Sequence, residues 1–135
     1  MSPPAEPVSA RPLLDKLGVR ADSRVALIGA FDDAFRNLLV DRTPFVEEGS
    51  PGESVDLIVM TADSLDELVQ LRELRARIVS NGAIWIVSRK GKQATIRDTD
   101  VIAATLDAGL VDNKVVSFSD THTALRAVIR LRDRP

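Results

Sequence analysis

The side chains best placed for chemistry follow one predicted strand. Residues 24–33 (RVALIGAFDD) read as a buried strand over 25–28 that ends at Gly29 and turns directly into a helix capped by Asp32 or Asp33. In nucleotide-binding α/β proteins, such a turn holds the phosphate or carboxylate end of a ligand. The two carboxylates already occupy the anion-attracting end of the helix, so an adenosine or a cationic ligand suits this turn better than a phosphate. The same residues also fit a plain strand-to-helix turn.

The other candidate residues each have a structural and a chemical interpretation. Trp85 lies between two isoleucines in a predicted strand, which favours a core position over adenine stacking. His122 follows Asp120 in a predicted turn, either as a surface histidine or as a general base. A basic loop follows the same strand as Trp85 and is either solvated or in contact with an anionic ligand or partner; it contains Arg89, Lys90, Lys92 and Arg97.

Composition excludes several kinds of site. The 135 residues include no Cys, one His and no Tyr, and the net charge is −2. The absence of Cys excludes disulfides, thiolate zinc sites and a Cys nucleophile, and one His excludes a metal site that needs two imidazoles. Near-neutral charge and few aromatic residues argue against nucleic-acid binding. No apolar run is long enough to span a membrane, and we expect a cytoplasmic protein.

The pattern of apolar runs predicts one α/β domain. Residues 1–10 hold three prolines and read as a disordered leader, and residues 11–135 form a single domain. We expect a three-layer, Rossmann-like domain with a mostly parallel sheet of about six strands. The apolar residues of the segment 123–132 fit both the alternating pattern of a strand and the spacing of a helix. The turn before it favours a strand and hence a C-terminal antiparallel hairpin. The other predicted elements are strands at 25–28, 44–47, 55–60, 83–87 and 114–118, and helices at 13–17, 32–39, 64–80 and 99–108.

The predicted helix 64–80 carries more apolar surface than packing on one sheet face requires. Ser64 and Glu67 form a capping box at its start, and the pair Asn81-Gly82 ends it. Its apolar side chains cover about 220° of the helical wheel. Either the helix lies between other helices, or part of it meets a protein partner or a second copy of the chain. These side chains are Leu65, Leu68, Val69, Leu71, Leu74, Ile78 and Val79.

Several segments together resemble a shortened class I S-adenosylmethionine-dependent methyltransferase. They are LDKLGV at 14–19 leading into RVALIG at 24–29, VDLIV at 55–59, and NGAIWIV at 81–87. More closely, the segments 82–91, 100–104 and 108–110 (GAIWIVSRKG, DVIAA and AGL) resemble a small bacterial domain family of unknown function that is similar to the methyltransferase fold. The resemblance implies the methyltransferase strand order with the outer strand missing.

The resemblance also implies a cofactor site, from which this sequence departs. Active methyltransferases of this class carry an acidic residue at the end of the first strand, followed by three glycines at alternate positions. The glycines let the backbone approach the methionine end of S-adenosylmethionine. Here the acidic position falls on Leu27, the first glycine is Gly29, and the other two positions fall on Phe31 and Asp33. A phenylalanine at the second position fills much of the space that the cofactor needs.

The candidate cofactor-binding residues are therefore Gly29, Phe31, Asp32 and Glu47, with Glu48 as the alternative ribose-holding acid. No nucleophile, metal cluster or positioned acid–base pair is found, so we predict no catalytic residue and no metal ligand. We expect a non-catalytic methyltransferase-like module that needs no cofactor and binds a partner or a nucleotide-like ligand. The alternatives are an S-adenosylmethionine-dependent methyltransferase with an aberrant cofactor loop, and a small homodimeric interaction protein that uses the helix 64–80.

Overall fold

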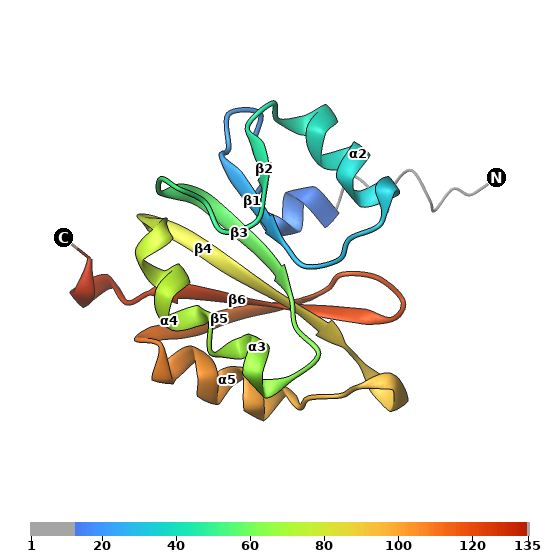
Figure 1. The fold of residues 1–135 in the computed structure, drawn as a ribbon, viewed down its shortest axis with the longest axis vertical. Coiled ribbons are helices and arrows are strands. Elements are labelled where there is room, and N and C mark those ends of the chain that lie inside the picture. Colours follow the sequence, from blue (N-terminus) through green and yellow to red (C-terminus); the bar gives the residue numbers. More distant parts are fainter. Residues whose placement is uncertain (1–12, 135) are drawn as a thin grey trace.

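The computed structural model describes residues 13–134 and contains a six-stranded sheet in the order β2-β1-β3-β4-β6-β5 (Figure 1). Strands β2, β1, β3 and β4 are parallel, β6 runs antiparallel to β4, and β5 runs antiparallel to β6. The predicted strand order and C-terminal hairpin are confirmed. The leader predicted over 1–10 lies outside the described residues. The strands are β1 (Val25–Ile28), β2 (Val46–Glu48), β3 (Val55–Thr61), β4 (Ile78–Arg89), β5 (Leu110–Ser117) and β6 (His122–Ile129).

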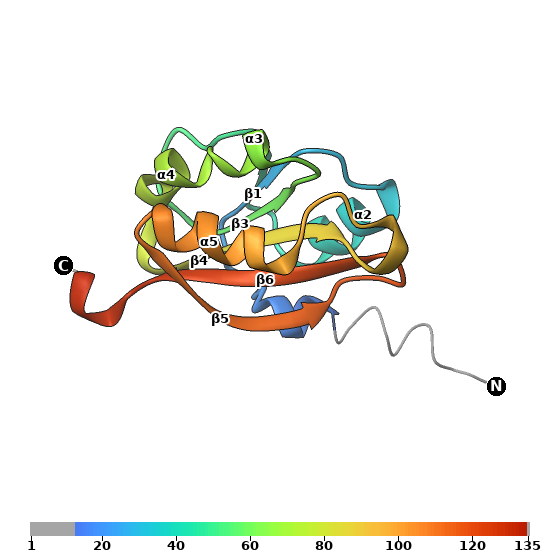
Figure 2. The same cartoon turned by 90° about the horizontal axis from the view of Figure 1, so that it is seen from below.

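Helices cover both faces of the sheet, which gives the three predicted layers (Figure 2). One face packs against the short helix at 13–17 and against α2 (Asp33–Arg42). The other face packs against α3 (Leu65–Leu68), α4 (Leu71–Leu74) and α5 (Asp98–Asp107). Among the described residues, no helix combines the length and the apolar character that a membrane span requires.

Trp85 contacts both the sheet, to which it belongs, and the helix at 13–17. Its side chain is fully buried in β4, on the α2 side of the sheet, where it packs among residues of that core. Its indole Nε1 donates a hydrogen bond of 2.9 Å to the carbonyl oxygen of Leu17. The predicted core position of Trp85 is therefore confirmed, and adenine stacking by this residue is excluded by its burial.

The segment 64–80 does not form the long helix predicted for it. Ser64 does begin a helix, because the Glu67 amide donates to its hydroxyl at 3.3 Å. The chain then forms only two single turns, α3 and α4, and a 3-10 turn over Arg75–Arg77. Apolar residues at helical spacing in both turns are still buried, because these separate turns pack against the same face of the sheet.

Strand β4 begins at Ile78, earlier than the predicted start at 83, because Ile78 pairs with Val55 of the neighbouring strand. Gly82 does not end a helix. A Cβ at this position would lie 2.7 Å from the carbonyl oxygen of Asp56, so the glycine permits the close approach of β3 and β4. The pairing is non-local, and it overrides the local helical pattern.

Candidate functional site

A pocket of about 330 Å³ opens where the carboxyl ends of β1, β3 and β4 meet, the edge at which open α/β sheets bind ligands. Its walls come from the turn between β1 and α2, from α2, and from the turn between β5 and β6. We call it the phenylalanine pocket, after its lining residues Phe31, Phe35 and Phe118. The other lining residues are Leu13, Ala30, Asp32, Ala34, Leu38, Thr61, Val87, Ser119, Thr121 and His122.

Gly29 directly follows β1, with φ of 103°, and precedes Ala30, the first residue of the turn that lines the pocket; Gly29 itself is not part of the lining. A Cβ on Gly29 would collide with Oγ1 of Thr61, the last residue of β3. The same oxygen accepts a hydrogen bond of 3.3 Å from the Ala30 amide. The glycine is thus required by the contact between the turn and β3, and the Thr61 side chain occupies the space beside it.

Phe31 turns its ring into a cluster of three phenylalanines. Its ring is stacked on that of Phe35, with centroids 5.3 Å apart, and lies 6.2 Å from that of Phe118. The rings of Phe35 and Phe118 are 5.0 Å apart. Arg36 holds the backbone of Phe31 as well, since its Nη1 donates to the Phe31 carbonyl oxygen. Phe31 is therefore held both by the packing of its ring and by a hydrogen bond to its carbonyl oxygen.

Asp32 is the cap of α2. Its Oδ1 accepts a hydrogen bond of 2.8 Å from the Phe35 amide, and Asp33 is the first residue of the helix. The sequence left the cap open between Asp32 and Asp33; the structure assigns it to Asp32, which is also the one of the two that lines the pocket. The carboxylate is favourably placed at the positive end of the helix.

The two acids of β2 lie elsewhere. Glu48 accepts hydrogen bonds from Arg36 at 2.9 and 3.0 Å. These bonds lower the pKa of Glu48 and raise the pKa of Arg36 from their ordinary values. Glu47 is exposed and pairs with Ala26, whose side chain belongs to the core on the opposite face from α2. Neither acid lines the phenylalanine pocket.

His122 enters the same pocket from the start of β6. Its Nδ1 lies 2.7 Å from Oγ1 of Thr121. Among the described residues, this hydroxyl is the hydrogen-bond partner found for the His122 ring, and a role as general base stays a prediction. Within residues 13–134, no group of three or more His, Asp or Glu side chains could hold a metal ion.

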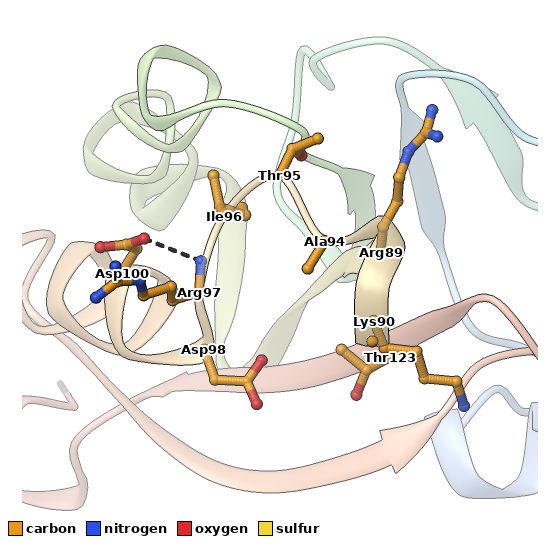
Figure 3. Close-up of a pocket in the computed structure, with 10 residues that line it drawn as sticks. Arg89, Lys90, Ala94, Thr95, Ile96, Arg97, Asp98, Asp100 and Thr123 are labelled. Atoms are coloured by element: carbon orange, nitrogen blue, oxygen red, sulfur yellow. Dashed lines mark hydrogen bonds between the residues drawn. The ribbon is translucent and has the colours of Figure 1, made fainter.

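The predicted basic loop lines a second, polar pocket between the end of β4 and the start of α5 (Figure 3). Arg89 points away from the acidic residues of α5, and its Nε lies 3.1 Å from a carboxylate oxygen of Asp63. Lys90 donates a hydrogen bond of 2.9 Å to Ser117. The Arg97 amide donates to Asp100 at 2.9 Å. The cationic groups of Arg89 and Lys90 are therefore bound to the protein's own side chains.

The chain is similar in fold to several solved structures, among them methyltransferases. The pyocyanin biosynthetic protein PhzM matches with a TM-score of 0.71 and 9% identity over 93% of this chain, which spans 56% of PhzM. A TehB-like SAM-dependent methyltransferase from Corynebacterium glutamicum matches with a TM-score of 0.58 and 13% identity over 90% of this chain and 86% of its own. Aeropyrum pernix fibrillarin with natively bound S-adenosyl-L-methionine matches with a TM-score of 0.59 and 15% identity, over 90% of this chain and 74% of the fibrillarin chain.

These likenesses show the fold: the chain is a methyltransferase-like, Rossmann-like α/β domain. No protein-family model matches the sequence. No curated protein matches it in sequence either.

Proposed function

We propose that this chain is a non-catalytic methyltransferase-like module that binds a ligand or partner through the phenylalanine pocket. The observation that supports it most is the ring cluster of Phe31, Phe35 and Phe118. Phe31, one member of the cluster, belongs to the β1–α2 turn. In methyltransferases the corresponding turn must be free of bulky side chains so that the cofactor can approach the backbone.

The residues of this site do not fit S-adenosylmethionine. Leu27, at the position of the usual acid, is 1% exposed and belongs to the core. Gly29 is the single glycine left in the turn, and Thr61 fills the space beside it. Glu48, an acid at the end of β2, is held by Arg36.

The pocket nevertheless has the properties of a binding site. Its volume of about 330 Å³ is within the range of small-molecule sites, about 300–1,000 Å³. Its walls are mainly apolar and aromatic, and a few hydroxyl groups stand among them. Such a surface binds a small apolar group, from either a free ligand or a protein side chain.

A thermal-shift scan against S-adenosylmethionine, S-adenosylhomocysteine and ATP tests this proposal. A ligand present at about 100 times its Kd would stabilise the fold by about 2.7 kcal/mol. For a domain of this size, the melting temperature would rise by several degrees. We expect no rise at millimolar S-adenosylmethionine.

A saturable rise would favour the alternative, a methyltransferase with an aberrant cofactor loop. The observation on the side of this alternative is that a protein of the same fold, fibrillarin, holds S-adenosyl-L-methionine. If the cofactor does bind, Phe31→Gly should tighten its binding, because the substitution removes a ring from the turn.

A second candidate function is self-association through the surface of α3. Leu65 and Val69 are 58% and 64% exposed, and they line a pocket of about 220 Å³ together with the buried Leu68. An exposed ion pair between Arg72 and Asp107 lies at its margin. Because this margin carries both charges, two copies related by a two-fold axis could exchange the pair. The partner that suits this surface is a second copy of the chain.

The expected result is a dimer that Val69→Glu dissociates, measured by sedimentation velocity. Val40→Glu is the matched control, because Val40 is 53% exposed on α2, away from this surface. Leu71 and Leu74 are unsuitable for the test, since both are buried and a charge there would disrupt the core. A wild-type monomer at high concentration would exclude this function.

A further inference from the structure

We infer that the phenylalanine pocket selects an organic cation with an aromatic or other apolar body, and disfavours anions. The inference rests on the proposed function, which makes this pocket a binding site, and it adds the chemical class of the ligand. Three features of the pocket support it: the rings, the formal charge of its lining, and the neutralisation of the neighbouring arginine.

Aromatic side chains are concentrated in this pocket. The chain has four phenylalanines in 135 residues, and three of them line the pocket. The rings of Phe31 and Phe118 are inclined to each other by 58°, and both are half-buried, whereas Phe35 is buried. Ring faces attract ammonium groups electrostatically. An apolar ligand body gains area burial from the same rings.

The charge of the pocket is negative. Among its lining residues, Asp32 is the only one with a formal charge when His122 is neutral. The hydrogen bond from the Phe35 amide fixes the position of the Asp32 carboxylate. An anion bound here would meet this carboxylate, whereas a cation would be attracted to it.

The nearest arginine on α2 does not reverse this charge. Arg36 is one turn along the helix from Asp32, but its guanidinium is bound to Glu48 and to the Phe31 carbonyl oxygen. Its side chain is absent from the lining of the pocket. The hydroxyl groups of Ser119 and Thr121 also line the pocket, but Ser119 already accepts from the amides of Thr121 and His122, and Thr121 is paired with the His122 ring. The attraction for a cation therefore comes from the rings and from Asp32.

Tryptamine and indole-3-acetate test this inference, because they share one ring system and carry opposite charges. We expect isothermal titration calorimetry to show tighter binding of tryptamine, weakening as salt is raised. Asp32→Asn should weaken tryptamine binding by about fivefold, the upper end of what an exposed charge pair contributes. Asparagine caps a helix as well as aspartate does, so the fold is retained.

Asp33→Asn is the matched control, because it removes the adjacent carboxylate, which does not line the pocket. It should leave the affinity for tryptamine unchanged. Equal binding of both indoles would overturn the charge selection and leave the proposed function standing. Absence of binding by tryptamine at millimolar concentration would overturn the inference alone. Saturable stabilisation by S-adenosylmethionine would instead overturn the proposed function.

Discussion

Gly29→Ala is expected to destabilise the fold by about 3 kcal/mol or more. The φ of 103° is unfavourable for any residue with a Cβ, and such backbone strain costs about 1–3 kcal/mol. The new methyl group would also collide with Thr61, and overpacking of this kind costs about 1–3 kcal/mol. Urea denaturation measures the sum of the strain and overpacking costs as a fall in the unfolding free energy, provided that the m-value is unchanged.

Gly18→Ala separates the two effects. Gly18 also has a positive φ, 78°, but nothing lies within 4 Å of the position that its Cβ would take. Gly18→Ala should therefore cost only the backbone strain, about 1–2 kcal/mol of unfolding free energy. Adding Thr61→Ala to Gly29→Ala should recover part of the loss. If Gly29→Ala costs no more than Gly18→Ala, then Thr61 does not fill the space beside the turn.

Trp85→Ala should cost about 3–5 kcal/mol, as large-to-small substitutions of buried aromatic residues do. The side chain is fully buried, and the sheet and the helix at 13–17 both pack around it. The loss would appear as a lower urea midpoint.

Trp85→Phe tests the hydrogen bond alone. The phenyl ring keeps most of the apolar volume, but the Leu17 carbonyl oxygen loses its donor at 2.9 Å. An unsatisfied buried acceptor costs about 1–3 kcal/mol. Phe45→Leu is the comparison, since Phe45 is 53% exposed and its substitution should be nearly neutral. A neutral Trp85→Phe would show that the bond does not hold the helix at 13–17.

Much of the fold follows from local sequence patterns. The apolar runs of β1 and β3 and the cap Asp32 depend on neighbouring residues, so they can be predicted from the sequence. The region 64–80 could not be predicted in this way. Its apolar residues satisfy a helical period, but the pairing of Ile78 with Val55 places the start of β4 there. A local pattern carries no information about this pairing.

The candidate site shows the same limit. Gly29, Phe31 and Asp32 lie within one short stretch of the sequence, 29–32, which is why one turn could be singled out. Thr61 and Phe118 come from distant segments, and only the folded sheet places them against that turn. The scarcity of phenylalanine was a signal that could have been used, because three of the four occur in this one pocket.

A titration of ¹⁵N-labelled protein with S-adenosylmethionine, followed in ¹H–¹⁵N correlation spectra, reports directly on the turn. The amides of Gly29, Ala30 and Phe31 lie where the cofactor would approach the backbone. We predict no saturable shift of these three amides at about 1 mM cofactor, a concentration that would reveal binding as weak as about −4.1 kcal/mol. Saturable shifts centred on them would contradict the proposal that packing has closed the cofactor path.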